Sequence, residues 1–348
     1  LMLNEQRITD MANGLRSIAQ LSDPPEQIDR GWISADGLQI IQRRVPLGVI
    51  GIIFEARPNV TADAAGVTFK SGNAVILRGG KEAVQTNLAI AKALREALTQ
   101  SGLPADAIQM VADPSHQSAQ EMMNLTKYID VLIPRGGRGL IQRVVKTATV
   151  PVIETGAGNC HVYVDRDADL EMATAIAVNA KVQRPSVCNA AEKLLIHRQV
   201  ASTYLPVIAK ALIKHGVQLR GDEAARKIVP EIIPVTAEDW DTEYNDLIMA
   251  VKVVDSLDAA ITHINDHSTH HSETIITNNL ERGRKFQEQI DSACVYVNAS
   301  TRFTDGGMFG FGAEIGISTQ KLHARGPMGL HQLTTIKYEI TGNGQIRK

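Results

Sequence analysis

The longest apolar run of the chain is Val45-Pro46-Leu47-Gly48-Val49-Ile50-Gly51-Ile52-Ile53-Phe54. It opens a region, extending to about residue 164, in which short β-branched runs alternate with helical patterns. Such alternation is typical of βαβ units built around a parallel sheet. We expect buried strands at residues 49–54, 74–77, 107–111 and 128–133, and an amphipathic helix over residues 81–100. The run itself is too short, and too interrupted by proline and glycine, to span a membrane.

A second α/β region is expected from about residue 154 to 326. Its helices are predicted near residues 170–181, 201–215 and 280–290, and its strands near 192–196, 249–254, 273–277 and 294–297. The acidic segment 222–246 is interpreted as a surface excursion. Residues 37–44 and 334–340 have the alternating pattern of exposed strands and fit neither region.

Composition excludes several classes of protein. The 36 Lys and Arg residues are matched by 38 Asp and Glu residues, giving a net charge of −2, so no basic excess is available for nucleic acid or an anionic membrane. The three cysteines lack CxxC spacing, which disfavours a disulfide framework or a zinc site. We therefore expect a reduced, cytoplasmic protein without a metal. Leu1 is not an initiator residue, so we expect the natural chain to begin earlier.

Cys188 lies in Gln183-Arg184-Pro185-Ser186-Val187-Cys188-Asn189, between a predicted helix and a predicted strand. A cysteine in such a polar loop next to arginine can act as a nucleophile, but a free cysteine is as often buried filler. Cys160 and Cys294 each sit in an alternating strand pattern, which favours filler at both positions.

Two glycine turns follow predicted strands, namely Arg78-Gly79-Gly80-Lys81 and Arg135-Gly136-Gly137-Arg138. Glycines at a strand-to-helix turn let backbone N–H groups approach a phosphate. Neither turn matches a standard nucleotide-binding fingerprint, and each alone could be an ordinary tight turn. Two such turns in one parallel sheet, both with arginine, favour a dinucleotide.

Three other segments have both a functional and an ordinary interpretation. His263, His267, His270 and His271 are crowded enough for a metal site, but a loop after Asp266 would break the spacing, so a solvated helix end is favoured. Residues 154–159 could place a carboxylate near a reaction centre or form a glycine-rich crossover. Residues 298–307 could bind a charged substrate, although an ordinary loop is favoured on local grounds.

Together these segments resemble the γ-glutamyl phosphate reductases (glutamate-5-semialdehyde dehydrogenases) of the aldehyde dehydrogenase superfamily. The resemblance begins at about residue 28 and is most specific over residues 183–189, 296–307 and 318–329. Family members usually carry an additional N-terminal helical segment. The resemblance implies two doubly wound α/β domains plus a β-strand oligomerisation arm: a cofactor-binding domain over residues 1–36 and 46–153, a catalytic domain over 154–326, and the arm over 37–45 and 327–348.

The resemblance also implies roles for individual residues. Cys188 would be the nucleophile, and Asn59 would stand near the asparagine of the oxyanion hole. The implied cofactor-binding residues are Arg78, Gly79, Gly80, Lys81, Gly136, Gly137 and Glu243, the last of these on the nicotinamide ribose. Lys81 stands where relatives that use NAD carry a glutamate, which implies NADPH. The implied anchors for the substrate carboxylate and phosphate are Arg184, Arg302, Lys321 and Arg325.

The implied reaction is the NADPH-dependent reduction of L-glutamyl 5-phosphate to L-glutamate 5-semialdehyde through a Cys188 thioester, a step of proline biosynthesis. A homo-oligomer is implied, and contact with glutamate 5-kinase is a further possible partnership. Glu154 resembles the residue that activates water in hydrolytic aldehyde dehydrogenases, so such an enzyme is the first alternative. A catalytically silent scaffold of the same fold is the second.

Overall fold

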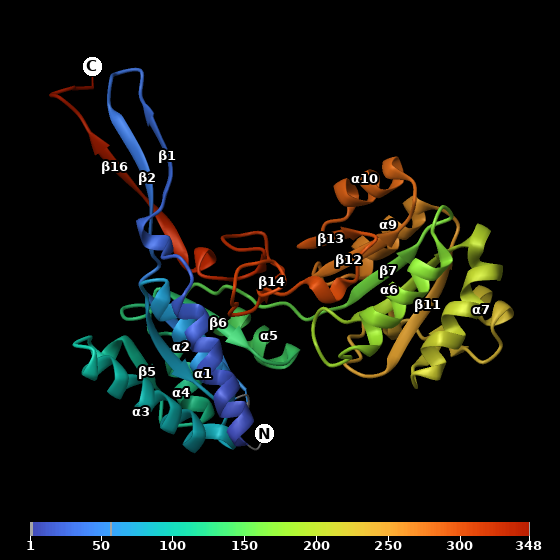
Figure 1. Cartoon of the computed structure of the whole chain (residues 1–348), viewed down its shortest axis with the longest axis horizontal. Coiled ribbons are helices and arrows are strands. Elements are labelled where there is room, and N and C mark those ends of the chain that lie inside the picture. Colours follow the sequence, from blue (N-terminus) through green and yellow to red (C-terminus); the bar gives the residue numbers. More distant parts are fainter. Residues whose placement is uncertain (1–2, 56–57, 348) are drawn as a thin grey trace. The chain divides into compact units, whose positions relative to one another are not determined.

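The computed structural model describes residues 3–55 and 58–347 (Figure 1). Ala56 and Arg57, which belong to the segments that carry the resemblance, lie outside this range. The chain divides into two compact units. The first contains the residues up to Thr155, Gly306–Gly316 and the residues from Leu322 onward, and the second contains Gly156–Asp305 and Ile317–Lys321. Residues 306–316, which we expected in the second domain, therefore pack with the first unit.

The first unit is built on a parallel sheet of strand order β5-β4-β3-β6. Its strands are β3 (Val49–Phe54), β4 (Ala74–Arg78), β5 (Ile108–Met110) and β6 (Val131–Arg135). Its helices are α1 (Glu5–Ala19), α2 (Pro58–Lys70), α3 (Val84–Gln100), α4 (His116–Met122) and α5 (Arg138–Thr147), with short 3-10 turns at Pro24–Glu26, Lys81–Ala83, Ala105–Ala107 and His331–Leu333. The strand predicted at residues 49–54 is confirmed at both ends.

Alternate residues of β3 explain why both faces of this sheet are covered. Ile50 and Ile52 pack in one core cluster with apolar residues of α1, α2 and α3. Ile53, on the opposite face, packs in a second cluster with residues of α4 and α5. Because β3 buries both faces, its sequence is a continuous apolar run rather than an alternating one.

Three antiparallel strands form a separate sheet of the first unit, which we call the arm: β1 (Ile28–Ile33), β2 (Gln39–Pro46) and β16 (Thr334–Thr341). Figure 1 shows β1, β2 and β16 running side by side, with β2 in the centre. The register of β2 and β16 runs from Thr334 opposite Pro46 to Thr341 opposite Gln39. The two strands that fitted neither region are thus partners of each other, whereas β1 was not predicted.

The second unit contains a parallel sheet of strand order β10-β9-β11-β8-β7-β12-β13. These strands are β7 (Cys160–Val164), β8 (Ala191–His197), β9 (Gln218–Gly221), β10 (Ile233–Pro234), β11 (Ile248–Val254), β12 (Ser272–Ile276) and β13 (Cys294–Val297). One face packs against α6 (Leu170–Val182), α7 (Arg198–Lys214) and α8 (Glu223–Ile228), and the other against α9 (Leu257–His267) and α10 (Leu280–Gln289). Both units are therefore doubly wound.

The acidic segment 222–246 lies mostly at the surface, as expected, but it has more regular structure than a simple excursion. It contains α8, the edge strand β10 and a 3-10 turn at Glu238–Trp240. Asp239 is buried, and its carboxylate accepts hydrogen bonds from Arg220 at 2.8 Å and from the Tyr244 hydroxyl at 2.6 Å. Burial alone would raise the pKa of Asp239, but these donors, together with Thr236, lower it to about 2. The segment is anchored by an ionised carboxylate.

Two short strands complete the described chain, β14 (Ile317–Ser318) and β15 (Gly326–Pro327), with a 3-10 turn at Thr301–Phe303. Within residues 3–55 and 58–347, no helix has the length and apolar character needed to cross a membrane.

Candidate active site

Cys188 lies in the turn that connects α6 to β8 in the second unit. The amide of Ala190 donates to the carbonyl of Val187 at 3.0 Å and closes this turn. All three cysteines are in the described chain, and Cys188 is the one that is partly exposed, because Cys160 and Cys294 are both buried. Since a nucleophile must be accessible to its substrate, the exposure of the Cys188 side chain favours the role expected of it.

The carbonyl of Cys188 is enclosed by residues 158–160. A Cβ atom on Gly158 would lie 1.4 Å from this carbonyl oxygen, so no larger residue fits there without a backbone shift. The thiol of Cys160 donates to the same oxygen, with 3.2 Å between sulfur and oxygen. Burial raises the pKa of Cys160 well above its ordinary value, so this thiol keeps the proton that it donates. We did not predict either contact from the sequence, because the alternating pattern around Cys160 indicated only a buried strand residue.

Glu243 was expected to contact the nicotinamide ribose. In the structure its Oε1 atom accepts a hydrogen bond from the N–H of Gly158 at 2.6 Å. This carboxylate therefore holds the backbone segment that encloses the Cys188 carbonyl. A ribose contact would have to use the remaining acceptor positions of the same group.

The segment 301–304 is fastened to the turn that carries Cys188. Thr301 Oγ1 donates to the carbonyl of Asn189 at 2.7 Å, and Asn189 Nδ2 donates to the carbonyl of Thr304 at 2.8 Å. Arg302 Nε donates to Gln183 Oε1 at 2.8 Å. The loop after β13 is thus part of the candidate site rather than an ordinary surface loop. Asn189 was not singled out from the sequence, although it is the neighbour of Cys188.

The structure brings two of the expected anion anchors to this region. Burial lowers the pKa of Arg302, and the positive charge of Arg184 lowers it further, whereas the Cys188 thiolate raises it. Arg302 thus lies within electrostatic range of both residues. Lys321, in the same unit, is exposed and forms an ion pair with Asp291 at 2.7 Å. Arg325 belongs to the first unit and is half-buried.

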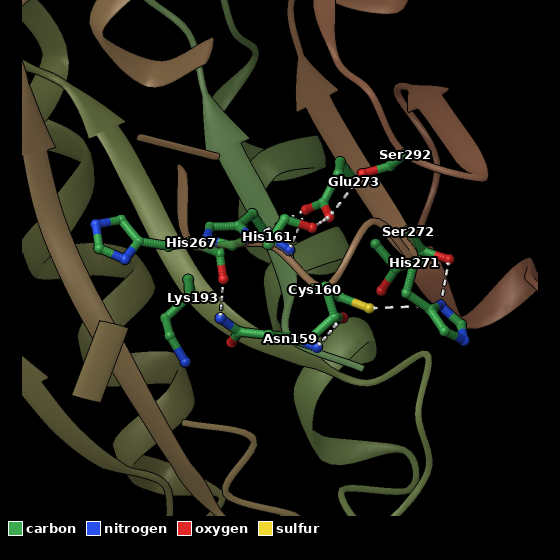
Figure 2. Close-up of polar contacts among 12 residues, drawn as sticks. Asn159, Cys160, His161, Lys193, His267, His271, Ser272, Glu273 and Ser292 are labelled. Atoms are coloured by element: carbon green, nitrogen blue, oxygen red, sulfur yellow. Dashed lines mark hydrogen bonds and ion pairs between the residues drawn. The ribbon is translucent and has the colours of Figure 1, made fainter. Parts of the chain in front are cut away.

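Behind Cys160 lies a buried polar network that joins β7 to β12 (Figure 2). The Glu273 carboxylate accepts from the backbone N–H of His161 at 2.7 Å and from Ser292 Oγ at 3.2 Å, and the Ser268 hydroxyl also donates to it. Burial raises the pKa of Glu273 to about 8, and burial lowers the pKa of His161. At neutral pH both groups are therefore mainly uncharged, as a dry interior requires.

The predicted helix end is present, because α9 ends at His267, and His267 and His270 are partly exposed. The expectation of a solvated site is wrong for His263 and His271, which are both buried. His263 Nδ1 lies 3.0 Å from Lys252 Nζ, and His267 Nδ1 lies 2.8 Å from Asp241 Oδ1. No group of His, Cys, Asp or Glu residues in the described part of the chain has the geometry of a metal site.

In the first unit, both glycine turns lie at the carboxyl ends of parallel strands, after β4 and after β6. A Cβ atom on Gly79 would lie 2.2 Å from Asn87 Nδ2, and one on Gly136 would lie 2.7 Å from the Glu55 carboxyl carbon. The N–H of Gly137, at the start of α5, donates to Glu55 Oε2 at 3.1 Å. This edge of a parallel sheet is where dinucleotides bind in doubly wound folds.

Arg78 and Lys81, both expected to bind the cofactor, differ in their surroundings. The Arg78 guanidinium is buried and donates from Nη2 to the carbonyls of Pro114 and Ser115, at 2.5 and 2.7 Å. Lys81 is exposed and begins the 3-10 turn before α3. Lys81 is therefore the more accessible of these two side chains to a ligand.

Asn59 and Glu154 also belong to the first unit. Asn59 lies in the first turn of α2, is exposed, and donates from Nδ2 to Asp63 Oδ2 at 3.1 Å. Glu154 is half-buried, and burial raises its pKa. Burial thus disfavours the charged form of this carboxyl group.

Comparisons with known proteins place this geometry in a family. A model described as the aldehyde dehydrogenase family matches residues 3–232 and 235–338. The γ-glutamyl phosphate reductase of Limosilactobacillus reuteri is 79% identical over 348 residues, which are 100% of this chain and 84% of the relative. The crystal structure of γ-glutamyl phosphate reductase from Thermotoga maritima superposes with a TM-score of 0.98 at 51% identity, over 100% of this chain and 84% of that one.

A more distant structure shares the fold alone. An engineered glycolyl-CoA reductase with bound NADP+ is 18% identical and has a TM-score of 0.72, over 97% of this chain and 88% of that one. The expected fold class, an aldehyde dehydrogenase-like α/β architecture, is confirmed.

Proposed function

This chain belongs to the aldehyde dehydrogenase family and, within it, to the γ-glutamyl phosphate reductases, and from that premise we propose that it reduces L-glutamyl 5-phosphate to L-glutamate 5-semialdehyde and phosphate. The observation that carries the proposal is the partly exposed Cys188, whose carbonyl is held by Gly158 and Cys160. Such a reduction is a step of proline biosynthesis.

The proposed chemistry follows from the reactivity of an acyl phosphate. The Cys188 thiolate attacks the carbonyl carbon, and phosphate leaves without an acid because it is a good leaving group. The developing oxyanion is assigned to the Cys188 N–H, with Asn59 as the predicted second donor. The resulting thioester is reduced by hydride, which a bound nicotinamide cofactor supplies. Collapse of the tetrahedral species returns the thiolate and frees the semialdehyde.

The first unit fits a nicotinamide dinucleotide. At Gly79 and Gly136 a Cβ atom would displace the Asn87 amide or the Glu55 carboxyl group, and both glycines lie at the sheet edge where dinucleotides bind. Gly79, Gly80, Gly136 and Gly137 would hold the phosphates, and Lys81 would contact the 2′-phosphate of NADPH. Arg78 would act by holding the 114–115 turn rather than by direct contact.

We assign the substrate phosphate and carboxylate first to Arg184 and Arg302, because these cations lie near Cys188. Lys321, already paired with Asp291, and Arg325 are assigned secondary roles. A homo-oligomer built through the arm and a cytoplasmic location are part of the same proposal. The exposed apolar side chains of the arm support the homo-oligomer. The three free cysteines support the cytoplasmic location. Contact with glutamate 5-kinase stays a prediction.

The test is the reverse reaction, measured as NADP+ reduction with glutamate 5-semialdehyde in the presence and absence of inorganic phosphate. Phosphate-dependent turnover that disappears in Cys188→Ala but persists in Cys294→Ala is expected. Turnover without phosphate would instead indicate a hydrolytic aldehyde dehydrogenase that uses Glu154. No turnover under either condition would favour a silent scaffold.

A further inference from the structure

The first unit contains a small cavity of about 70 Å³ beside Asn59. It is lined by residues of β3, the start of α2, the end of β6 and the segment after Gly306, among them Ile52, Asn59, Asp63, Arg135, Glu314 and Ile315. By volume it has room for about two water molecules, so it suits a small polar head group rather than a whole substrate.

Among the residues that the structure describes, three charged side chains line this cavity, two carboxyl groups and one guanidinium. Asp63 accepts from Asn59 Nδ2 at 3.1 Å, and Glu314 Oε2 accepts from the N–H of Gly306 at 2.8 Å. Burial raises the pKa of Asp63, and Arg135 offsets only part of that effect. With both carboxylates ionised, the charged side chains among the described residues of the lining sum to −1, which favours a cationic ligand over an anion.

The spacing between Asp63 and Asn59, the predicted oxyanion donor, also fits the ammonium group of the substrate. Asp63 follows Asn59 by four residues of α2, a rise of about 6 Å along the helix axis, and the Asp63 carboxylate adjoins the Asn59 amide at 3.1 Å. In glutamate 5-semialdehyde the ammonium nitrogen is four bonds from the reacting carbonyl carbon, about 5 Å in an extended chain. A substrate whose oxyanion is bound by Asn59 would therefore present its ammonium group near Asp63.

We propose that this cavity is the subsite for the α-ammonium group of the amino-acid substrate, with Asp63 and Glu314 as its acceptors. The inference rests on the proposed function and adds the group by which the enzyme would recognise an amino acid. An ammonium donates several hydrogen bonds, and ionised carboxylates are strong acceptors for them. Ile52 and Ile315 would cover the adjacent carbon atoms.

The experiment compares two aldehydes in the phosphate-dependent oxidation with NADP+. One is glutamate 5-semialdehyde, and the other is 5-oxopentanoate, which has the same carbon chain without the amino group. For each enzyme the readout is the ratio of the two kcat/KM values. We expect the unsubstituted enzyme to prefer the amino aldehyde, and Asp63→Asn to lower this ratio by about tenfold or more, because a charge-assisted contact is lost.

Glu314→Gln tests the second acceptor and should lower the ratio in the same direction while keeping an oxygen for the Gly306 N–H. Asp106→Asn is the matched control, because Asp106 is an exposed residue of the same unit that pairs with Arg95. It should leave the ratio unchanged. Thermal unfolding of each variant shows whether the fold is retained, and if Asp63→Asn fails to fold, the Glu314→Gln ratio decides the matter.

Equal losses for both aldehydes in Asp63→Asn would overturn the inference, because they would show that Asp63 only positions Asn59. An unchanged ratio in both variants would overturn it as well. These results differ from failure of the proposed function, in which the unsubstituted enzyme would show no phosphate-dependent oxidation of glutamate 5-semialdehyde. That failure would overturn both conclusions.

Discussion

At the scale of single residues, accessibility separates the three cysteines. Cys160 and Cys294 are buried, and burial raises the pKa of the Cys160 thiol. Because alkylation needs an accessible thiolate, iodoacetamide should modify Cys188 first. Cys188→Ala should abolish turnover and leave cofactor affinity nearly unchanged. Peptide mapping after brief labelling identifies the modified residue, and preferential labelling of Cys160 or Cys294 would contradict the assignment.

Gly158 offers a second residue-scale test. A methyl group at this position would overlap the Cys188 carbonyl oxygen, so Gly158→Ala must displace the turn that carries the nucleophile. We expect turnover to fall at least about tenfold, which corresponds to about 1.4 kcal/mol of transition-state stabilisation. Gly31→Ala is the control, because its Cβ atom would have no neighbour closer than 3.5 Å. If the two variants had equal turnover, the contact with Cys188 would not matter to the reaction.

Lys81 bears on cofactor choice, since Arg78 is committed to the carbonyls of Pro114 and Ser115. A charge-assisted contact is worth about 1.5–3 kcal/mol, and the exposure of Lys81 limits it to the lower part of that range. Lys81→Glu should therefore raise KM for NADPH by about tenfold or somewhat more, with little change for NADH. Steady-state kinetics with both cofactors measure this. Equal losses would show that Lys81 does not contact the 2′-phosphate and merely begins a turn.

At the scale of elements, the sequence predicted what depends on neighbours in the chain. Strand β3 was predicted at both ends because it lies between Gly48, a turn residue within the apolar run, and Glu55, which ends the run. Asp239 and His263 were misjudged because their burial depends on partners in other segments, which local pattern does not contain. Arg78 is similar, since the carbonyls that bind it are 36 and 37 residues away. At the candidate site, Cys188 and Arg302 were identified, whereas Gly158 and Asn189 emerged only from the fold.

The network between β7 and β12 predicts a pH dependence of stability. The pKa of Glu273 rises from 4.5 to about 8 on folding, so between these values the folded state binds more protons than the unfolded state. Its contribution to stability is therefore full below pH 4.5 and is lost as the pH rises through about 8. One group changes the free energy of unfolding by at most about 1.4 kcal/mol per pH unit.

Glu273→Gln should remove this dependence. Urea unfolding at pH 5.5 and pH 8 should show the variant gaining stability relative to the unsubstituted protein at the higher pH. Taking the difference between the two proteins cancels the titration of distant groups that both retain, whereas His161, whose Nδ1 lies 3.0 Å from Glu273 Oε2, contributes to the difference. A difference independent of pH would mean that Glu273 keeps the same charge in the folded and unfolded states.

At the scale of the whole molecule, we propose that the arm is an association surface. Its strands expose large apolar side chains, including Ile33 at 74%, Ile340 at 59% and Tyr338 at 49%. Exposed apolar residues on an extended sheet mark an interaction surface, and an uncovered edge strand would invite aggregation. A second copy of the chain that covered this sheet would bury the apolar side chains and shield the edge strand.

Deleting residues 334–348 should therefore dissociate the oligomer before it unfolds the subunit. The deletion removes β16, its pairing with β2 and the 3.0 Å ion pair between Arg43 and Glu339, whereas the parallel sheets of both units keep all their strands. Sedimentation velocity should show a smaller species, and circular dichroism should show that helical content is retained. As a milder variant, Ile340→Lys places a charge on the exposed face and should weaken association in the same direction. If the truncated protein sediments as the full-length protein does, the arm is not the association surface, and its apolar face has some other partner.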